Sequence, residues 1–229
     1  MLGREIFKKA DKIICVSNYE KKLVLKNMGI DGKKISVIPN GLNLEEFKGI
    51  HKKEKELKSL LYVGRLEKYK GVQFLLRVLP KLDDDVFVEI VGIGPYKQEL
   101  KKLVSNLGLE ERVIFYENLE RKDLIQKFSD ANIFVSLSTR ESYGITIAEA
   151  LALGTPCIVS NHSALREWVD GKDCLGIDYP PDIDTLSNLI NILMGKITDY
   201  SSIKNRAPSW DTVAKKLIEI YNQIIKIDM

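Results

Sequence analysis

Short apolar runs of strand length alternate with helix-like patterns through most of the chain, and this alternation limits the fold more than any other feature. Strands are predicted over residues 60–63, 86–91, 113–115, 133–136, 157–159 and 175–177. Helices are predicted over residues 72–82, 96–107, 122–130, 145–153, 163–169 and 183–194. Such repeats build a parallel sheet with helices on both faces. We therefore predict an α/β fold with a doubly wound, Rossmann-like sheet of six parallel strands, whose ligands bind beyond the carboxyl ends of the strands.

The N-terminal part of the chain lies outside this pattern. Strands are predicted over residues 12–16 and 35–38, separated by a helix that begins with a capping box of Ser17 and Glu20 and ends at Gly29. Two strands and one helix bury too little surface to be stable alone. Residues 48–58 are mostly charged and predict a solvated linker. The sequence thus divides into residues 1–45, a sheet domain over residues 46–205 and a helical end over residues 206–229.

The helical end is amphipathic. A helix is predicted over residues 210–227, with Ser209 at its N-cap. Its apolar side chains form one stripe: Val213, Leu217, Ile220, Tyr221, Ile224 and Ile225. Such a stripe must be buried against another surface. Because the strands of the sheet are already covered, we expect this surface to lie elsewhere, including in a second copy of the chain.

Composition excludes several classes of function. The 229 residues are 45% apolar and 29% charged, which permits a sizeable core. The net charge is only +3 and lysines alternate with glutamates, so nothing argues for a nucleic-acid partner. Cys15, Cys157 and Cys174 lie in apolar runs without metal-ligand or disulfide spacing, which indicates a reducing compartment. No apolar run approaches membrane-spanning length, and the polar start is not a signal peptide, so we expect a cytoplasmic protein.

Polar residues and glycines follow almost every predicted strand. The carboxyl ends of parallel strands lie at one edge of a sheet, so these residues are expected to gather on one rim. They are Gly64, Arg65, Lys68, Lys70, Gly71, Gly92, Gly94, Tyr116, Glu117, Asn118, residues 139–154, Ser160, Asn161 and His162.

The stretch TRESYGITIAEALALG, residues 139–154, carries most of the chemistry on this rim. Gly144 opens a helix and lets a ligand approach the backbone, and the free amides of Ile145 and Thr146 suit an anion such as phosphate. Glu141 lies in the turn, and Glu149 lies in the helix, where its carboxylate can accept two hydrogen bonds from a vicinal diol. The alternative is that Glu141 only stabilises the helix dipole and that Glu149 is solvated.

Two cations are expected near these amides. Arg65 and Lys70 flank a loop that leads from the first strand of the sheet into a helix. Arginine binds phosphate oxygens in two places and lysine acts as a compact point charge, so the pair suits a diphosphate. The alternative is that both are solvated loop charges.

Two further features of the rim are less specific. The run Gly92-Ile93-Gly94-Pro95 follows a strand but lacks the third glycine of a dinucleotide fingerprint, so it predicts a tight turn that lets a base or ribose come close. His162 is one of only two histidines and is either a catalytic base or an ordinary polar loop residue. We found no Ser, His and Asp arrangement and no metal-ligand cluster.

Several motifs together resemble a known enzyme family. They are VIPNGLN at residues 37–43, YVGRL at residues 62–66 with Lys70 and Gly71, VGIGP at residues 91–95, and ESYGITIAEA at residues 141–150 with GTP at residues 154–156. This combination resembles the retaining glycosyltransferases of family four with the GT-B fold, also called the group 1 family. The resemblance covers nearly all of the chain and is specific, because the motifs are several, ordered and properly spaced.

The resemblance implies two Rossmann-like domains facing across a cleft, with a nucleotide-sugar donor held mainly by the C-terminal one. Arg65 and Lys70 would grip the donor diphosphate and Glu141 would contact the sugar, so these three are the predicted catalytic residues. The predicted donor-binding residues are Gly64, Gly92, Gly94, Asn118, Ser142, Tyr143, Gly144, Ile145, Thr146 and Glu149, the last holding the ribose. The cations and helix amides can stabilise the leaving diphosphate without a metal ion, and no further cofactor is implied.

The chain departs from the family pattern in two places. Members usually begin with a complete N-terminal domain that carries the acceptor site, whereas this chain opens where that domain would be ending. We therefore expect a C-terminal fragment or one half of a split enzyme, which needs the missing domain or a partner chain. The run SNHSALRE at residues 160–167 replaces a commoner glycine-containing turn, so Arg166 and His162 leave the sugar contacts open.

Three functions follow from these observations. The first is transfer of a sugar from a nucleotide-diphosphate-sugar donor with retention of configuration, with this chain as the donor-binding half. The second is a non-catalytic donor-binding or assembly subunit that needs a partner chain. The third is another GT-B relative, such as a sugar-nucleotide epimerase. The donor base, the sugar and the acceptor stay open, and a lipid-linked acceptor would bring the complete enzyme to the inner face of a membrane.

Overall fold

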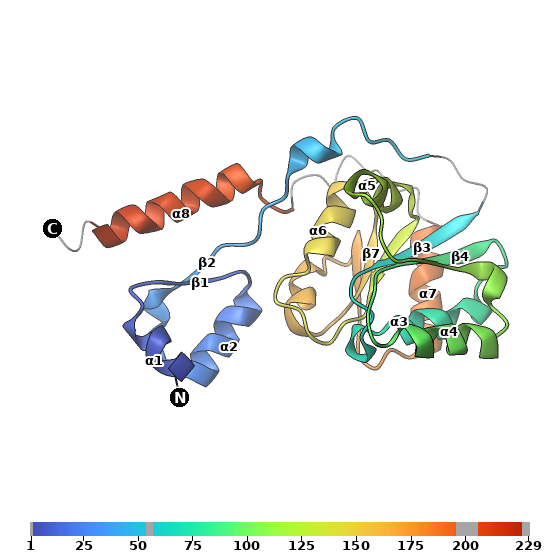
Figure 1. The fold of residues 1–229 in the computed structure, drawn as a ribbon, viewed down its shortest axis with the longest axis horizontal. Coiled ribbons are helices and arrows are strands. Elements are labelled where there is room, and N and C mark those ends of the chain that lie inside the picture. Colours follow the sequence, from blue (N-terminus) through green and yellow to red (C-terminus); the bar gives the residue numbers. More distant parts are fainter. Residues whose placement is uncertain (1, 54–56, 196–205, 226–229) are drawn as a thin grey trace. The chain divides into compact units, whose positions relative to one another are not determined.

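The computed structural model of the chain describes residues 2–53, 57–195 and 206–225. The chain divides into two compact units. The larger is Glu45–Arg206, which we call the sheet domain, and the smaller combines Met1–Leu44 with Ala207–Met229, which we call the small unit. Figure 1 labels the elements along the chain. Among the described residues, no helix has both the length and the apolar character needed to span a membrane.

The small unit is built around two short parallel strands, β1 (Ile13–Cys15) and β2 (Ile35–Val37). Helix α2 (Asn18–Met28) connects them, and the predicted cap is confirmed because the amide of Glu20 donates to Oγ of Ser17 at 3.0 Å. The carboxylate of Glu20 accepts from the amide of Val16 at 2.7 Å. Gly29 ends the helix with a φ of 62°. Helix α1 (Leu2–Lys9) precedes β1 and was not among the elements predicted from the sequence.

Helix α8 (Trp210–Ile225) also belongs to the small unit. It is tied to the N-terminal segment through Leu42, whose amide donates to the carbonyl of Pro208 at 2.9 Å and whose carbonyl accepts from the amide of Trp210 at 3.3 Å. Val213 is its one buried residue within the range that the structure describes. Trp210, Ile218, Tyr221 and Ile225 are each more than half exposed.

The sheet domain contains the predicted six-stranded parallel sheet, which confirms the predicted fold class. The strands are β3 (Lys58–Val63), β4 (Val86–Val91), β5 (Val113–Tyr116), β6 (Ile133–Ser136), β7 (Cys157–Ser160) and β8 (Cys174–Ile177). They lie in the order β5-β4-β3-β6-β7-β8, and every neighbouring pair is parallel. The chain therefore reverses its direction of strand addition between β3 and β6. In a doubly wound sheet this switch point is where ligands bind.

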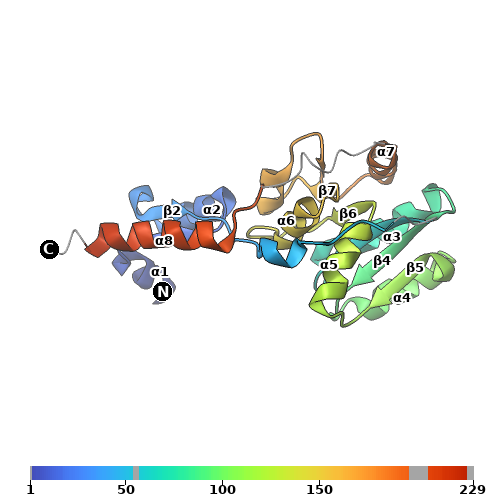
Figure 2. The same ribbon diagram turned by 90° about the horizontal axis from the view of Figure 1, so that it is seen from above.

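Helices cover both faces of the sheet (Figure 1, Figure 2). Helices α3 (Val72–Val78), α4 (Lys97–Asn106) and α7 (Ile183–Met194) pack on one face. Helices α5 (Arg121–Asp130) and α6 (Ile145–Ala152) lie side by side on the other. The predicted α-helix over residues 163–169 is wrong, because Ser163–Trp168 form a 3₁₀ helix, η6, that begins at Ser163 with a φ of 53°.

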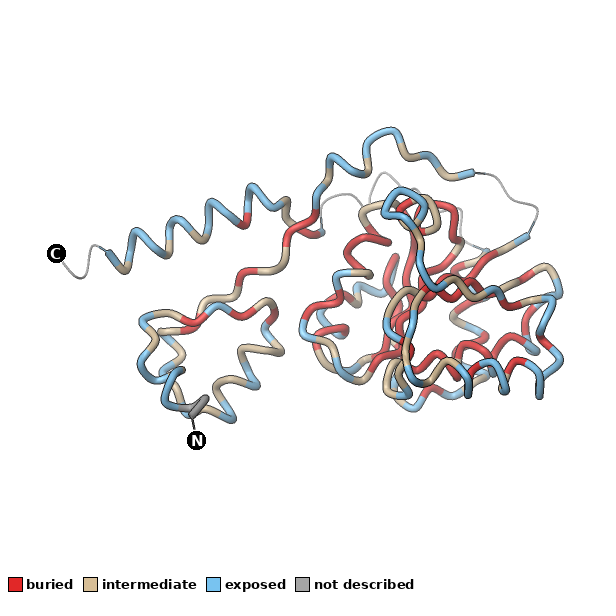
Figure 3. Tube along the Cα trace, in the orientation of Figure 1, coloured by how far each residue is buried: buried red, intermediate tan, exposed pale blue. Residues whose placement is uncertain are grey.

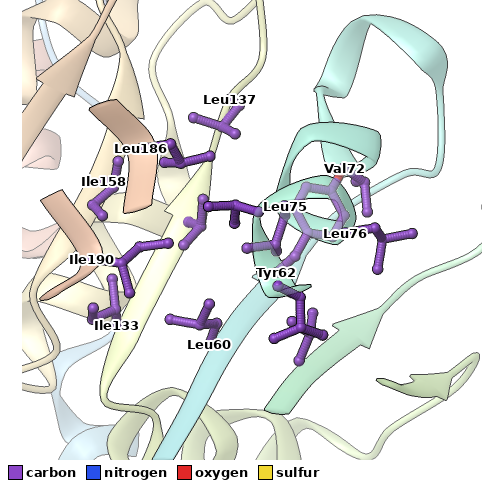
Figure 4. Close-up of a cluster of buried hydrophobic side chains, with 14 of the residues drawn as sticks. Leu60, Tyr62, Val72, Leu75, Leu76, Ile133, Leu137, Ile158, Leu186 and Ile190 are labelled. Atoms are coloured by element: carbon purple, nitrogen blue, oxygen red, sulfur yellow. The ribbon is translucent and has the colours of Figure 1, made fainter. Parts of the chain in front are cut away.

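The main core lies between the sheet and helices α3, α4 and α7. Buried residues of the sheet domain concentrate in its strands (Figure 3). Leu60 and Ile133 of the two central strands meet Leu76 and Ile190 of the covering helices (Figure 4). Each of these four side chains is fully buried, and burying one of this size stabilises the fold by about 1.5–3 kcal/mol.

A buried ion pair fixes α5 on the other face. Glu89 of β4 is buried, and its carboxylate accepts from Nζ of Lys127 in α5 and from the Tyr116 hydroxyl, the latter at 3.2 Å. Lys127 also donates to that hydroxyl at 2.9 Å. Removing one partner of such a pair would leave a buried charge uncompensated. The network therefore holds the position of α5.

Candidate active site

The loops that follow β3 and β6 meet at the switch point of the sheet. The amide of Thr139 donates to the carbonyl of Tyr69 at 3.0 Å, which joins the two loops directly. A Cβ atom at Gly71 would lie 2.5 Å from the carbonyl oxygen of Leu137, so the loops approach more closely than a side chain would allow. This contact brings residues of two predicted motifs to one place.

Lys70 and Glu141 form an ion pair across this junction. Nζ of Lys70 lies 2.5 Å from Oε1 of Glu141, and their side chains are 16% and 24% exposed. A lysine ammonium has three donors, so Lys70 can hold Glu141 and still bind an incoming anion. The pair thus places a positive and a negative group at the mouth of the turn that leads into α6.

The turn before α6 is anchored on η6. The amide of Glu141 donates to Oγ of Ser163 at 3.1 Å, and the amide of Ala164 donates to the carbonyl of Glu141 at 3.2 Å. The indole Nε1 of Trp168 donates to the carbonyl of Tyr143 at 2.6 Å in a buried contact. Burial raises the pKa of Tyr143 to about 12, so its phenol stays protonated at neutral pH. These contacts hold the turn in one conformation.

The first turn of α6 offers backbone amides without a competing side chain. Gly144 is the N-cap with a φ of 93°, and no side chain caps the helix. A Cβ atom there would lie 3.0 Å from side-chain atoms of both Ile147 and Leu165. The first turn holds no acidic residue, and Ile145 is 39% exposed. The positive end of the helix dipole is therefore available to an anion.

An open cavity lies beside this junction, beyond β3, β4 and β5. Its volume is about 460 Å³, and it is lined by Val63, Gly64, Arg65, Val91, Gly92, Ile93, Glu117, Asn118, Leu119 and Leu124. The four predicted residues Gly64, Arg65, Gly92 and Asn118 are thus brought together. Gly92 has a φ of 150°, and a Cβ atom there would lie only 1.9 Å from the carbonyl oxygen of Gly64. A Cβ atom at Gly94 would lie 2.2 Å from the carbonyl oxygen of Leu66.

Charged groups at the edge of this cavity are held in pairs. Nε of Arg65 lies 2.9 Å from Oε1 of Glu67, while the arginine side chain remains 69% exposed. The hydroxyl of Tyr62 donates to the carbonyl of Arg65 at 2.9 Å, and burial raises the pKa of this phenol. Nζ of Lys97 lies 2.5 Å from Oε1 of Glu117. The guanidinium of Arg65 is therefore accessible, although its backbone is fixed.

Glu149 lies in the second turn of α6 and is buried. Its Oε1 lies 2.7 Å from Nη2 of Arg121, the first residue of α5, and Nε of Arg121 lies 2.8 Å from Oε2 of Glu46. Burial raises the pKa of Glu149, and the charge of Arg121 opposes that shift. Arg121 lies between Leu119 and Leu124, both of which line the cavity. Glu149 itself is not among the residues that line the cavity, and it contacts Arg121 from beside them.

The remaining predicted residues are distributed around these groups. Ser142 and His162 are exposed, and the ring of His162 stacks on that of Tyr179 at 6.3 Å between centroids. No group of three or more His, Cys, Asp and Glu side chains that could hold a metal ion occurs in the described part of the chain.

Sequence reasoning missed Arg121, Glu46 and Trp168. Their contacts depend on the tertiary fold, but a basic residue at the positive end of a helix was a signal that could have pointed to Arg121.

Two sequence families match the chain. The family described as "Glycosyl transferases group 1" matches residues 43–210, and the family described as "Glycosyltransferase Family 4" matches residues 1–46. The first match alone covers more than half of the chain.

Among individual relatives, an uncharacterized glycosyltransferase of Methanocaldococcus jannaschii is 29% identical over 92% of this chain and 59% of its own length. The UDP-Gal:alpha-D-GlcNAc-diphosphoundecaprenol alpha-1,3-galactosyltransferase of Escherichia coli is 29% identical over 98% of this chain and 60% of its own length. The chain thus spans about three fifths of the length of these relatives.

Solved structures share the fold. The Anabaena protein HepE, solved in complex with UDP and glucose, superposes with a TM-score of 0.86 at 20% identity, over 97% of this chain and 66% of that one. A sucrose-phosphate synthase from Thermosynechococcus elongatus has a TM-score of 0.84 at 23% identity, over 99% of this chain and 61% of that one.

Proposed function

The chain belongs to the glycosyl transferases group 1 family, which matches residues 43–210, and it shares its α/β fold with GT-B glycosyltransferase structures. From this premise we propose that the sheet domain binds a nucleotide-diphosphate-sugar donor and supplies the donor side of a sugar transfer that retains the anomeric configuration. The observation that carries the proposal is the contact between Lys70 and Glu141 at 2.5 Å, at the mouth of the turn that opens α6.

The diphosphate is assigned to the junction of the two loops. Lys70 lies there in an ion pair, the amides of Ile145 and Thr146 open α6, and the guanidinium of Arg65 is accessible at the edge of the neighbouring cavity. A planar guanidinium, an ammonium and helix amides together suit a group with several anionic oxygens. Glu141 would then face the sugar, with Ser142 and Tyr143 beside it in the same turn.

The nucleoside is assigned to the cavity beyond β3, β4 and β5. Its volume of about 460 Å³ is within the range of small-molecule sites. Gly92 and Gly64 line the cavity with backbone and without side chains, and Asn118 offers an amide to a base. Glu149 is assigned to the ribose, because an ionised carboxylate can accept from both hydroxyls of a diol.

The chemical step requires stabilisation of a leaving nucleoside diphosphate. The bond between the anomeric carbon and the diphosphate oxygen breaks, and the acceptor oxygen bonds to that carbon from the same face. The acceptor proton passes to the leaving phosphate oxygen. Arg65, Lys70 and the helix amides would stabilise the charge that develops on the diphosphate, and fixed donors of this kind make a large contribution to catalysis. No covalent nucleophile is assigned to Glu141.

A second candidate is a donor-binding or assembly subunit that needs a partner chain for transfer. One observation favours it: α8 exposes Trp210 and Tyr221 by 53% and 59%. One relative, from Saccharomyces cerevisiae, is named as the GPI3 subunit of a phosphatidylinositol N-acetylglucosaminyltransferase.

Titration calorimetry with UDP-, GDP- and ADP-sugars tests the shared part of both candidates. Binding of at least one donor, lost in Arg65→Ala and Lys70→Ala, is expected. Absence of binding for all three would reject donor binding. Pull-down of a chain that carries the acceptor domain then separates the candidates, since capture of such a chain supports the second and a stable monomer without a partner counts against it.

A further inference from the structure

Glu149 is held by an ion pair with Arg121 that no sequence motif indicated. Its carboxylate is 10% exposed, and Nη2 of Arg121 lies 2.7 Å from Oε1. The same guanidinium contacts a second carboxylate, because Nε lies 2.8 Å from Oε2 of Glu46. One arginine thus bridges two carboxylates from different segments, with Glu149 in α6 and Glu46 in the 3₁₀ helix Leu44–Phe47.

The position of Arg121 is unfavourable for the helix that carries it. Arg121 is the first residue of α5, at the positive end of the helix dipole. A cation at that end costs about 0.3–1 kcal/mol, the amount that a cation contributes at the opposite end. A residue that breaks a local rule in this way is often placed for function. Here the two carboxylates offset the cost.

We propose that Arg121 is a positioning residue for the donor site, which fixes the carboxylate of Glu149 in the orientation and the ionised state needed to accept the hydroxyls of a ribose. The proposal rests on the proposed function, in which Glu149 contacts the ribose. Arg121 acts through Glu149 and is not assigned any contact with the nucleotide.

Two physical effects support this role. A planar guanidinium that is anchored at Nε presents Nη2 in a fixed direction, so the bond to Oε1 restricts rotation of the Glu149 side chain. A carboxylate has two oxygens and about four lone-pair sites, so the bond to Arg121 leaves capacity for two hydroxyl donors. Burial alone favours the protonated form of Glu149, and a protonated carboxyl would present a donor where a diol needs an acceptor.

The role predicts a specific loss, which a general loss of structure would not mimic. Without Arg121 the site should lose its preference for a ribonucleotide over the 2′-deoxyribonucleotide, because the missing 2′-hydroxyl is one of the two groups that Glu149 would bind. Affinity for the 2′-deoxyribonucleotide should fall less, because only its 3′-hydroxyl still contacts Glu149. Damage to the fold would instead weaken both ligands by the same factor.

Calorimetry of the full chain with UDP and 2′-deoxy-UDP tests the proposal, with the ADP and GDP pairs run in parallel to allow for another base. Wild type should prefer the ribonucleotide by about tenfold or more, the usual effect of a hydrogen bond to a charged group. Arg121→Ala and Glu149→Gln should each reduce this ratio to about one. Arg121→Lys keeps the positive charge but not the planar guanidinium, so it should retain part of the ribose preference. Arg77→Ala, an exposed arginine on α3, should leave it unchanged.

The outcomes separate the inference from the function on which it rests. If Glu149→Gln abolishes the ribose preference and Arg121→Ala or Arg121→Lys keeps it in full, the positioning role is rejected and the proposed function stands. If wild type binds none of the nucleotides, or binds without any ribose preference, the assignment of Glu149 fails first. If Arg121→Ala does not fold, Glu46→Gln replaces it as the test. An unchanged ribose preference in both Arg121→Lys and Glu46→Gln would then overturn the proposal.

Discussion

Lys70 and Glu141 are separated by 71 positions in the sequence, yet Nζ and Oε1 lie 2.5 Å apart. The contact exists because β3 and β6 are neighbours at the switch point of the sheet, so that the loops after these two strands meet. It joins the predicted diphosphate site to the predicted sugar site. The two groups are part-buried, so their interaction is screened less than that of an exposed pair.

Glu141→Gln should separate the two roles of this pair. Removing the negative charge leaves Lys70 free to interact with phosphate, so affinity for the free nucleoside diphosphate should be unchanged or higher. Affinity for the nucleotide sugar relative to the nucleoside diphosphate should fall by about tenfold, because a hydrogen bond to a charged group is lost on the sugar. Calorimetry with both ligands measures the two effects.

The matched control for Glu141→Gln is Asp184→Asn. Asp184 forms an ion pair of the same length with Lys81, at 2.5 Å, but in an exposed position. The control should change neither affinity. Equal effects of the two substitutions would show that charge alone, and not the site, controls binding.

The affinity of the site should depend on pH through Glu149. Burial raises the pKa of this carboxyl, while Arg121 in α5 lowers it and Glu46 raises it further. The ionised form binds the diol, so affinity for a ribonucleoside diphosphate should fall as pH decreases through the pKa of Glu149. In Arg121→Ala that pKa rises, and the loss of affinity should begin at a higher pH. Calorimetry measures both curves between about pH 5 and pH 8, because native proteins are generally most stable in this range.

The same titration with a 2′-deoxyribonucleotide provides the reference, since it removes one of the hydroxyls assigned to Glu149. Its pH dependence should be weaker and similar in both proteins. An acidic loss of affinity that is identical in wild type and Arg121→Ala would contradict the coupling between Arg121 and Glu149.

Gly92→Ala should disrupt the cavity. The added methyl group would lie 1.9 Å from the carbonyl oxygen of Gly64, so the two loops must separate. Gly108→Ala is the control, because Gly108 has a φ of 64° with open space around it. The control should lower the free energy of unfolding by about 1–2 kcal/mol, which is the effect of a left-handed backbone conformation alone. Gly92→Ala should cost more and should also abolish nucleotide binding, as measured by urea denaturation and calorimetry.

Trp168→Phe should loosen the turn before α6. The change removes the bond from Nε1 to the carbonyl of Tyr143 and leaves a buried acceptor unpaired, which costs about 1–3 kcal/mol. Stability to urea and affinity for the nucleotide sugar should both decrease. Trp210→Phe, at a position that is 53% exposed, should stay within about 0.5 kcal/mol of wild type. If Trp168→Phe changes neither the stability to urea nor the affinity, the turn does not need the hydrogen bond from Trp168.

The sheet could be predicted from the sequence because its strands are buried on both faces and read as continuous apolar runs. Val86–Val91 and Ile133–Ser136 have the predicted bounds, and other strands differ by one or two residues at their ends. The 3₁₀ helix Ser163–Trp168 could not be predicted, because its conformation is set by contacts with the turn at Glu141 and Tyr143. Helix α1 was missed because its eight residues are too few to establish a helical period from the sequence.

The candidate site was accessible to sequence reasoning only in part. Glycines and cations that directly follow strands could be found by rule, and Gly64, Arg65, Gly92 and Asn118 do line one cavity. Arg121 lies three residues beyond Asn118 and reaches its partners across the fold, to Glu149 and to Glu46. Contacts of this kind depend on how α5 packs beside α6, which no local pattern encodes.

The central claim is that two cations and the amides of α6 form one pyrophosphate site. The measurement that tests it most directly is the ratio of affinities for a nucleoside diphosphate and the corresponding monophosphate, by calorimetry on wild type and Lys70→Ala, with Lys81→Ala as the control. Wild type should favour the diphosphate by about tenfold or more, and Lys70→Ala, unlike Lys81→Ala, should lose this preference. Equal affinities in wild type, or an unchanged preference in Lys70→Ala, would contradict it.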